Sequence, residues 1–553
     1  MRQPGTTPDA SESSSLDRRQ FLRLAAVAAA AVGAMPILAA CGPTPAAPTQ
    51  SAAAASPAAP TAAAAAGTTP LAKARLSINS QLTTPDPHKP DGLGGFIGLY
   101  LMGAQLFRLN PDFSVSPWLA EKIDITNNGL TATVTIKANA KYSDGTAVTA
   151  DDVVYAWDRS VQLKNPRLFL LGPVDTVTAS DARTVVFKLK QPFLGLTIGL
   201  ADYGFSIFPK AKVSADPAFF DKAPIISAGQ YVLKEWTPGT NEWAFEENPN
   251  FFGGPSMIKR LEFVAVPDNT SRVLQVTTGA IDYAYDLPAS ARADFPAEVK
   301  TFSVPILGMY HVNFNLDKAK GTPLADPRVR QAMSLAIDRD AISKRAFFTI
   351  SPPAKGFLYA GPPEGLEVLP NGGKRDLAAA KALLAQTATP TGGFKFTLNP
   401  WGQRPGWTDA GLVIKENLAD LGITVDVQPL DDATAIANLN SGNYDAQFSG
   451  NTQDPLTMLK NEFADTGTWT KWMHYDNPAV TKALSDAGFA ADPKTRLDLF
   501  HQAQTLAFAD MPLIPISERV VMVGSRVNRK ILYEANLQPG FNPRVATVAE
   551  FGK

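Results

Sequence analysis

Residues 394–427 read FKFTLNPWGQRPGWTDAGLVIKENLADLGITVDV, and this stretch predicts the class of the fold. Apolar and polar residues alternate at its start, which is typical of a strand, and Pro400 ends that strand. Residues 401–407 form a loop, after which apolar residues recur at helical spacing: Ile414, Leu418 and Leu421. Gly422 ends the helix, and the alternation resumes over 423–427. A strand, a helix and a second strand in this order predict a crossover unit of an α/β lobe.

Two other stretches predict the same mixture of elements. Alternation from Ala132 to Lys137 predicts a half-buried strand, and Thr149 is a credible helix cap with acidic residues in the first turn behind it. Asp326 caps another helix, with Pro327 at its first position. We therefore expect an α/β protein with mixed sheets.

The N-terminus has the organisation of an export signal. Arg18 and Arg19 precede an uncharged run over 24–40 that ends in small residues. Such a pattern is typical of a signal peptide rather than of a membrane span. The arginine pair resembles a twin-arginine signal, and Leu-Ala-Ala-Cys at 38–41 resembles a lipobox, whose cysteine is lipidated. We expect a signal peptide over 1–40 and a mature protein that begins with lipidated Cys41, anchored to the outer face of the cytoplasmic membrane.

A spacer and a globular body are expected behind Cys41. Residues 42–72 contain no charged residue and are mostly Ala, Pro, Thr and Ser, so they cannot bury enough apolar surface to offset the entropy of ordering. We expect a flexible linker over 41–74. Cys41 is the only cysteine, which excludes a disulfide within the chain. The formal net charge of −1 gives no reason to expect nucleic acid as a partner, and no later apolar run is long enough to cross a bilayer.

The body carries a series of motifs in a fixed order. The most specific runs from Tyr142 through Gly145 into the segment Thr149–Ala156. The others are shorter: Pro117-Trp118-Leu119-Ala120-Glu121, Gly229-Gln230-Tyr231, Asn248-Pro249-Asn250-Phe251-Phe252, Gly279-Ala280-Ile281-Asp282, Phe314-Asn315, Asp326-Pro327-Arg328-Val329-Arg330, Tyr475-Asp476-Asn477-Pro478 and Pro512-Leu513-Ile514-Pro515. Together they resemble family 5 of the bacterial extracellular solute-binding proteins, the oligopeptide-, dipeptide- and nickel-binding receptors of ABC importers. The resemblance extends from about residue 75 to the C-terminus.

The resemblance implies a fold like that of type II periplasmic binding proteins, with two lobes around a ligand cleft and an extra inserted domain. Applied to this chain, the resemblance implies that lobe I comprises residues 75–107, 223–307 and 516–553. The inserted domain would comprise residues 108–222, and lobe II would comprise residues 308–515. It also implies that the lobes close over a solute by a hinge motion and that the closed form docks on an ABC permease. A solute drives closure by binding the closed state more tightly. We expect a monomer without a cofactor.

The loop 401–407 is the first candidate ligand region. Ligands of α/β lobes bind outside the C-terminal ends of the strands, and this loop lies there. Trp401 and Trp407 offer indoles for stacking, and Arg404 is available for a carboxylate. The alternative is that the two tryptophans anchor the loop to its lobe.

The second candidate region contains Phe448, Asn451 and Asp454. Peptide-binding members of the family resemble it but carry a Trp, followed by an Asp that pairs with the amino group of the ligand. This chain lacks that Trp, and Asp454 corresponds better to the family's Asp-Pro turn. Asn451 favours neutral hydroxyl or amide partners. A strict peptide ligand is therefore less well supported here than in those members.

The third candidate region clusters Trp472, His474 and Tyr475, for which core packing is the alternative. Metal binding has little support, because the four histidines are far apart in sequence: His88, His311, His474 and His501. No hydrolase motif is present, so we expect a binding protein and no enzyme. Peptide is the favoured solute. An oligosaccharide, an opine-like compound and a metal chelate stay open, and so does a sensing role.

Overall fold

The computed structural model describes residues 70–527, except 90–92, 111–114, 194, 361, 363, 403, 453–454 and 491. The predicted export signal with Arg18 and Arg19, the predicted lipidation at Cys41 and the candidate ligand residue Asp454 lie outside the described residues. Within the described part of the chain, no helix is both long and apolar enough to cross a membrane.

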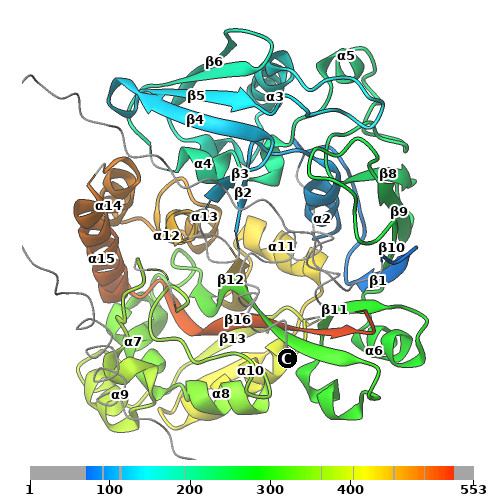
Figure 1. Ribbon diagram of the computed structural model, residues 1–553. Coiled ribbons are helices and arrows are strands. Elements are labelled where there is room, and N and C mark those ends of the chain that lie inside the picture. Colours follow the sequence, from blue (N-terminus) through cyan, green and yellow to red (C-terminus); the bar gives the residue numbers. More distant parts are fainter. Residues whose placement is uncertain are drawn as a thin grey trace, which may run out of the picture. The chain divides into compact units, whose positions relative to one another are not determined.

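A ten-stranded mixed sheet dominates the structure, in the order β14-β13-β15-β12-β16-β11-β1-β10-β9-β8 (Figure 1). One half contains strands from the ranges expected for lobe I: β1 (Ala74–Ile78), β8 (Tyr231–Glu235), β9 (Glu242–Glu247), β10 (Arg260–Ala265) and β11 (Tyr283–Leu287). The other half contains strands from the range expected for lobe II: β13 (Lys395–Pro400), β14 (Thr424–Val427) and β15 (Ala446–Thr452). In each half a central strand has parallel neighbours, β1 between β10 and β11 and β13 between β14 and β15.

Two long antiparallel strands, β12 (Lys300–Phe314) and β16 (Leu513–Ser525), join the two halves. β16 pairs with β11 on one side, and β12 pairs with β15 on the other. The register between β12 and β16 shifts between Pro305 and Met309 and again at Tyr310 and His311. Pro305 has no N–H to donate to the ladder. The two strands are therefore least regularly paired where they pass from one half to the other.

The crossover unit predicted from residues 394–427 is confirmed. β13 is followed by α10 (Trp407–Ala419) and then by β14, which is parallel to β13. The helix ends at Ala419 rather than at Gly422, which lies beyond it with a φ of 75°. A Cβ at Gly422 would lie 2.4 Å from the carbonyl oxygen of Thr391, so the position requires glycine.

The other predicted elements are also confirmed. Residues Thr131–Ile136 form β5, and α3 (Ala150–Gln162) begins after Thr149, whose backbone N–H donates to Asp152 at 2.8 Å. α7 (Pro327–Ala336) begins after Asp326, whose carboxylate accepts from the backbone N–H of Arg328. Local capping chemistry therefore fixes these helix starts, as the sequence suggests.

A separate antiparallel sheet lies in the range expected for the inserted domain, in the order β4-β5-β7-β6. Its other strands are β4 (Ala120–Thr126), β6 (Val174–Ala179) and β7 (Thr184–Leu189), and β2 (Phe107–Leu109) forms a hairpin with β3 (Val115–Pro117). The remaining helices are α2 (Leu93–Met102), α4 (Leu196–Gly199), α5 (Lys210–Val213), α6 (Asn269–Thr278), α8 (Arg339–Arg345), α9 (Leu377–Leu384), α11 (Asp432–Ser441), α12 (Pro455–Phe463), α13 (Thr468–Met473), α14 (Pro478–Phe489) and α15 (Pro493–Asp510).

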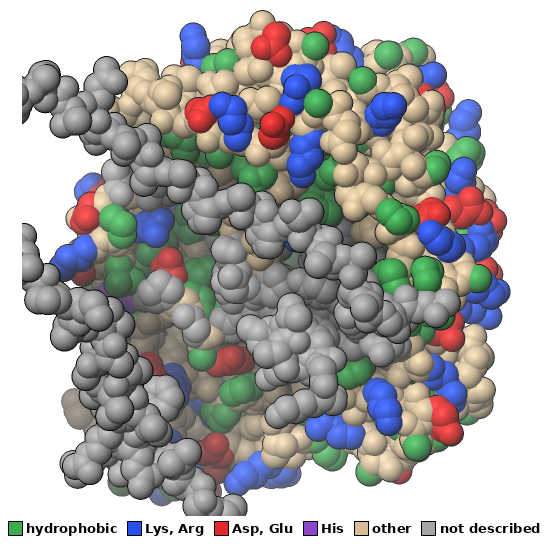
Figure 2. Space-filling view, viewed as in Figure 1, with side chains coloured by type: hydrophobic (Ala, Val, Ile, Leu, Met, Phe, Trp, Pro, Cys, Tyr) green, Lys and Arg blue, Asp and Glu red, His purple; other side chains and the backbone are tan. Residues whose placement is uncertain are grey.

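The two faces of the sheet at β12 differ in polarity. Tyr310, Val312 and Phe314 project to one face and pack in a core shared with α7, α8 and α10. His311 and Asn313 alternate with them, and His311 contacts Trp469 of α13 on the other face. On the surface shown in Figure 2, basic and acidic side chains are interspersed, in keeping with the near-zero net charge of the sequence.

Candidate functional site

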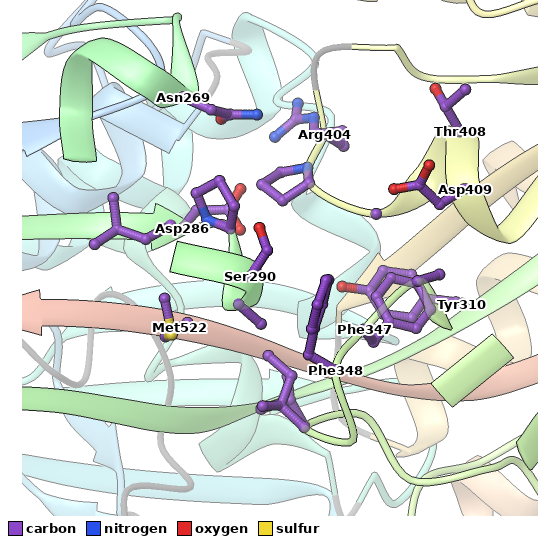
Figure 3. Close-up of a pocket in the computed structure, with 18 of the residues that line it drawn as sticks. Asn269, Asp286, Ser290, Tyr310, Phe347, Phe348, Arg404, Thr408, Asp409 and Met522 are labelled. Carbon is purple, nitrogen blue, oxygen red and sulfur yellow. The ribbon is translucent and has the colours of Figure 1, made fainter. Parts of the chain in front are cut away.

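A cavity of about 280 Å³ lies where the two halves of the large sheet meet beside β12 and β16. Its lining includes residues at the C-terminal end of β11, in the loop after β13, after α8, and on β16. Figure 3 shows Asp286 and Ser290 from the lobe I half opposite Tyr310, Phe347 and Phe348 from the lobe II half. The C-terminal ends of strands from both halves thus contribute to one space, the place where α/β folds bind ligands.

Asp286 provides an acidic group on the lobe I side. It has a φ of 55° and lies in β11 at a point where the register with β16 shifts. Such an irregularity changes the direction in which a strand residue points. Its carboxylate accepts a hydrogen bond from Asn79 Nδ2 at 3.2 Å, and the side chain stays half-buried at the cavity.

Aromatic rings form the lobe II side. Tyr310 stacks on Phe347 with a centroid distance of 4.7 Å, and its ring meets the edge of Trp407 at 5.4 Å. Phe448 lies behind them, 6.0 Å from Tyr310. Burial raises the pKa of Tyr310 above its ordinary value, so its phenol stays neutral at physiological pH. Phe348 is 46% exposed, which leaves an uncovered apolar ring at the cavity.

Two arginines lie at this cluster. The guanidinium of Arg404 donates to Asp432 at 2.7 Å and lies 5.8 Å from the ring of Trp401. The guanidinium of Arg519 lies 5.5 Å from the ring of Tyr310 and donates to Thr452 Oγ1 at 2.6 Å. The cavity surroundings therefore offer both a carboxylate and cationic groups next to flat apolar surfaces.

A buried polar cluster occupies the opposite face of the same strands. His311 Nδ1 lies 3.6 Å from Glu462 Oε1, and Asn451 Nδ2 donates to the same oxygen at 3.4 Å. Burial raises the pKa of Glu462 to about 8, and burial together with the charge of Arg519 lowers the pKa of His311 to about 3. Both side chains are therefore neutral at physiological pH.

The first candidate region lies at the cavity. Arg404 lines the cavity, and Trp401 is half-buried beside it with an indole N–H that has no hydrogen-bond partner among the described residues. Trp407 is buried in the core, where its ring contacts Tyr310 and Phe448. The alternative of anchoring the loop therefore fits Trp407, whereas Trp401 and Arg404 remain available to a solute.

The other candidates are more scattered. Phe448 is fully buried, and the side chain of Asn451 is engaged with Glu462. Trp472 donates to Asn440, His474 is exposed with a φ of 51°, and the hydroxyl of buried Tyr475 donates to Asp510. None of these three side chains is among the described residues that line the cavity.

Sequence reasoning missed several residues of the site: Asp286, Tyr310, Phe347, Phe348 and Arg519. Asp286 could have been found, because it closes a strand that follows Gly279-Ala280-Ile281-Asp282. The others lie inside long strands or after a helix, where the sequence gives no such signal. Among the described residues, no group of three or more His, Cys, Asp or Glu could hold a metal ion.

A sheet in two halves joined by crossing strands, with a lined cavity between the halves, defines the fold of the type II periplasmic binding proteins. The sequence model of the bacterial extracellular solute-binding proteins, family 5 Middle, matches residues 114–468. The chain therefore belongs to the family 5 solute-binding proteins, whose members bind solutes rather than catalyse reactions.

Similar proteins match this chain over most of their length. The periplasmic murein peptide-binding protein MppA of Escherichia coli K12 is 27% identical over 477 residues, 79% of this chain and 86% of that protein. The glutathione-binding protein GsiB of Pectobacterium atrosepticum is 27% identical over 475 residues, 82% of this chain and 90% of that protein. The structure of the binding protein AgaA of A. tumefaciens R10 in complex with agropinic acid superimposes with a TM-score of 0.71 at 22% identity, covering 84% of this chain and 98% of that one.

Proposed function

We propose that this protein captures a short peptide or peptide-like solute and delivers it to an ABC import permease. The observation that carries the proposal is the cavity beside the crossing strands, because carboxylate, guanidinium and aromatic groups surround a single space. A peptide presents an amino group, a carboxylate and side chains, which are the chemical complements of these three kinds of group.

The size of the cavity favours a small solute. Its volume of about 280 Å³ lies just below the range of about 300–1,000 Å³ that ligand pockets span. Dipeptides and tripeptides are compatible with this volume. The names of the relatives agree, since MppA is a murein peptide-binding protein and GsiB a glutathione-binding protein.

Trp401, Arg404 and Asp286 are the side chains that we assign to solute contact. Trp401 supplies a half-buried indole, Arg404 a cation and Asp286 an anion on the facing side. Trp407 and Phe448 support this surface from the core. We assign Asn451 to the buried polar cluster on the opposite face of the strands, and Trp472 and Tyr475 to the packing of lobe II.

Hinge closure between lobe I and lobe II is the mechanism we propose, with the domain boundaries expected from the sequence. The register shifts between β12 and β16 support it, because irregular pairing at the crossing point makes bending easier there. A solute that contacts both Asp286 and Arg404 binds the closed arrangement more tightly than an open one, and this difference drives closure.

Export by the twin-arginine route and anchoring through a lipid on Cys41 complete the proposal. Replacing Arg18 and Arg19 with Lys should leave the precursor in the cytoplasm, and cell fractionation with an antibody measures this. Unchanged export of that variant would remove the twin-arginine assignment.

An oligosaccharide is the second candidate solute. The exposed ring of Phe348 and the half-buried indole of Trp401 favour it, because flat aromatic faces at a binding site stack on sugar rings. An opine-like acid would also complement these charged groups, and AgaA, which has the same fold, was solved in complex with agropinic acid.

Isothermal titration calorimetry distinguishes these classes. The protein, freed of any retained solute by partial unfolding and refolding, is titrated with di- to pentapeptides, glutathione and malto-oligosaccharides. We expect short peptides to bind, and we expect Asp286→Asn to weaken them about tenfold or more, because it removes a charged partner. Asp476→Asn, at an exposed position outside the cavity lining, is the matched control. Binding of an oligosaccharide without binding of any peptide contradicts the proposal.

A further inference from the structure

Arg519 has an unusual course across the large sheet. It belongs to β16, but its side chain extends over β12 and reaches β15, where its guanidinium donates to Thr452 Oγ1 at 2.6 Å. Two glycines make room for it. A Cβ at Gly308 of β12 would lie 3.1 Å from Arg519 Cδ, and a Cβ at Gly450 of β15 would lie 2.9 Å from the same atom. The three strands are therefore built to hold this side chain in one position.

The held guanidinium lies against aromatic rings. Its Cζ atom is 5.5 Å from the ring centroid of Tyr310 and 5.8 Å from that of Trp407. Rings at this distance stabilise a cation through their negative faces. Tyr310 lines the cavity, so the charge lies beside a wall residue, although Arg519 is not itself among the lining residues.

Within the described part of the chain, no carboxylate forms an ion pair with Arg519, and its Nε is enclosed without a hydrogen-bond partner. A guanidinium has five N–H donors; Thr452 accepts from one of them, and the Tyr310 hydroxyl also interacts with the guanidinium. Half-buried charges are normally paired, because removal from water is costly. Arg519 is thus a cation that is held in place and partly desolvated, and no carboxylate of the described residues lies at ion-pair distance from it.

Arg404 differs in this respect. Its guanidinium already forms an ion pair with Asp432 at 2.7 Å, so its charge is compensated within the protein. An anionic group of a solute gains less from a compensated cation than from an uncompensated one. Between the two arginines near the cavity, Arg519 is therefore the better partner for a carboxylate.

We propose that Arg519 binds a carboxylate of the solute and is the main determinant of specificity for carboxylate-bearing solutes. This inference rests on the proposed function and narrows its solute class, because it requires a free carboxylate and excludes neutral sugars. The inference also places the contact with the solute carboxylate on β16, one of the two strands that join the halves of the sheet. Because Arg519 is next to the register shift that ends at Glu518, a solute bound to it contacts the part of the sheet where the two halves join.

Calorimetry with pairs of peptides tests the proposal. Each pair consists of a di- or tripeptide with a free C-terminal carboxylate and the same peptide as its C-terminal amide, and glutathione and maltotriose complete the set. We expect the full-length protein to prefer the free acid about 10- to 100-fold, the ratio typical of a charged hydrogen-bonded pair. Arg519→Met should lose this preference while the amide retains its affinity. Arg519→Lys should keep part of the preference, because it retains the charge but not the planar fork.

Lys494→Gln serves as the matched control, since it removes one positive charge from an exposed ion pair with Asp498 on α15. The melting temperature without solute separates binding from folding. Removing an unpaired cation should leave the melting temperature of Arg519→Met unchanged or higher. A large decrease in the melting temperature of Arg519→Met, together with an unchanged preference of that variant for acid over amide, would mean that Arg519 is structural, which overturns the inference.

The outcomes separate this inference from the proposed function. Peptides that bind equally well as acid and as amide support the proposed function but overturn the role of Arg519. If an acidic solute that is not a peptide binds through Arg519, the role of Arg519 is supported and the proposal of a peptide solute is contradicted. Binding of maltotriose alone, or of no member of the set, overturns both.

Discussion

Glu462 on α12 is a residue for which the structure predicts a large dependence of stability on pH. Its carboxyl is buried, one oxygen accepts from Asn451 Nδ2 at 3.4 Å, and the other oxygen has no hydrogen-bond partner in the part of the chain that the structure describes. Burial raises the pKa of Glu462 from 4.5 to about 8 in the folded protein. The folded state therefore holds this proton through a pH range in which the unfolded chain releases it.

The sign of the effect follows from the protons bound by each state. Between pH 4.5 and about 8 the folded protein binds more protons at Glu462 than the unfolded chain does, so the free energy of unfolding falls as pH rises. Each unit of pKa shift corresponds to about 1.4 kcal/mol, which gives an effect on the order of 3 kcal/mol at neutral pH. Glu462→Gln removes the titrating group and retains an oxygen for Asn451. The free energy of unfolding of the Glu462→Gln variant, measured relative to that of the native protein, should therefore increase from pH 5 to pH 8.

Urea denaturation followed by tryptophan fluorescence at several pH values between 5 and 8 measures this difference. Glu416→Gln is the matched control, because Glu416 is exposed and a hydrogen bond from Arg345 lowers its pKa. Glu416 is therefore ionised in both states throughout this range, and its variant should parallel the native protein. Parallel curves for Glu462→Gln as well would show that Glu462 is ionised in the folded state and would refute the reasoning.

Three further predictions test the packing and the anchor. Trp407→Ala should lower the free energy of unfolding by about 3–5 kcal/mol, because it leaves a cavity where a buried ring had packed. Trp401→Ala should lower the free energy of unfolding much less but should reduce solute affinity. Equal losses of stability for the two variants in denaturation curves would contradict the buried position of Trp407 and the half-buried position of Trp401. Arg159→Met should lower the free energy of unfolding by about 3–5 kcal/mol, because Asp86 stays buried without the two hydrogen bonds of 2.8 and 2.7 Å that it accepts from Arg159. A double variant that also carries Asp86→Asn should recover part of this loss in the same measurement. No recovery would mean that the unpaired charge is not the cause of the loss. Cys41→Ala should release the exported protein from the membrane fraction, and continued membrane association in fractionated cells would remove the lipid anchor.

The fold was largely predictable because its signals are local. Alternation over 394–400 and 423–427, with helical spacing between them, predicted β13, α10 and β14. Side-chain caps at Thr149 and Asp326 predicted two helix starts. Each of these signals depends on residues within one turn or one strand of each other, so tertiary contacts were not needed to interpret them.

The site was predictable only in part, because most of it depends on contacts between distant strands. The loop 401–407 could be found, since the rule that ligands bind at strand ends needs only the order of elements. Arg519 could not be found in this way. Its position depends on Gly308 and Gly450, which lie on two other strands and become its neighbours only when β12, β15 and β16 pair. Trp472 and Tyr475 are close in sequence, but Trp472 donates to Asn440 and Tyr475 to Asp510, so closeness in sequence alone does not bring their polar groups to one site.

The same three strands connect the buried polar cluster to the proposed carboxylate site. Asn451, which donates to Glu462, precedes Thr452 in β15, and Thr452 accepts from Arg519. Thr452 also donates its backbone N–H to the side-chain oxygen of Asn451 at 2.8 Å, so the amide of Asn451 is held at both ends. Deprotonation of Glu462 places a negative charge at one end of this chain of hydrogen bonds, and a solute carboxylate at Arg519 places another at the opposite end. Since like charges at the two ends repel each other through a poorly hydrated interior, carboxylate binding should weaken as Glu462 ionises.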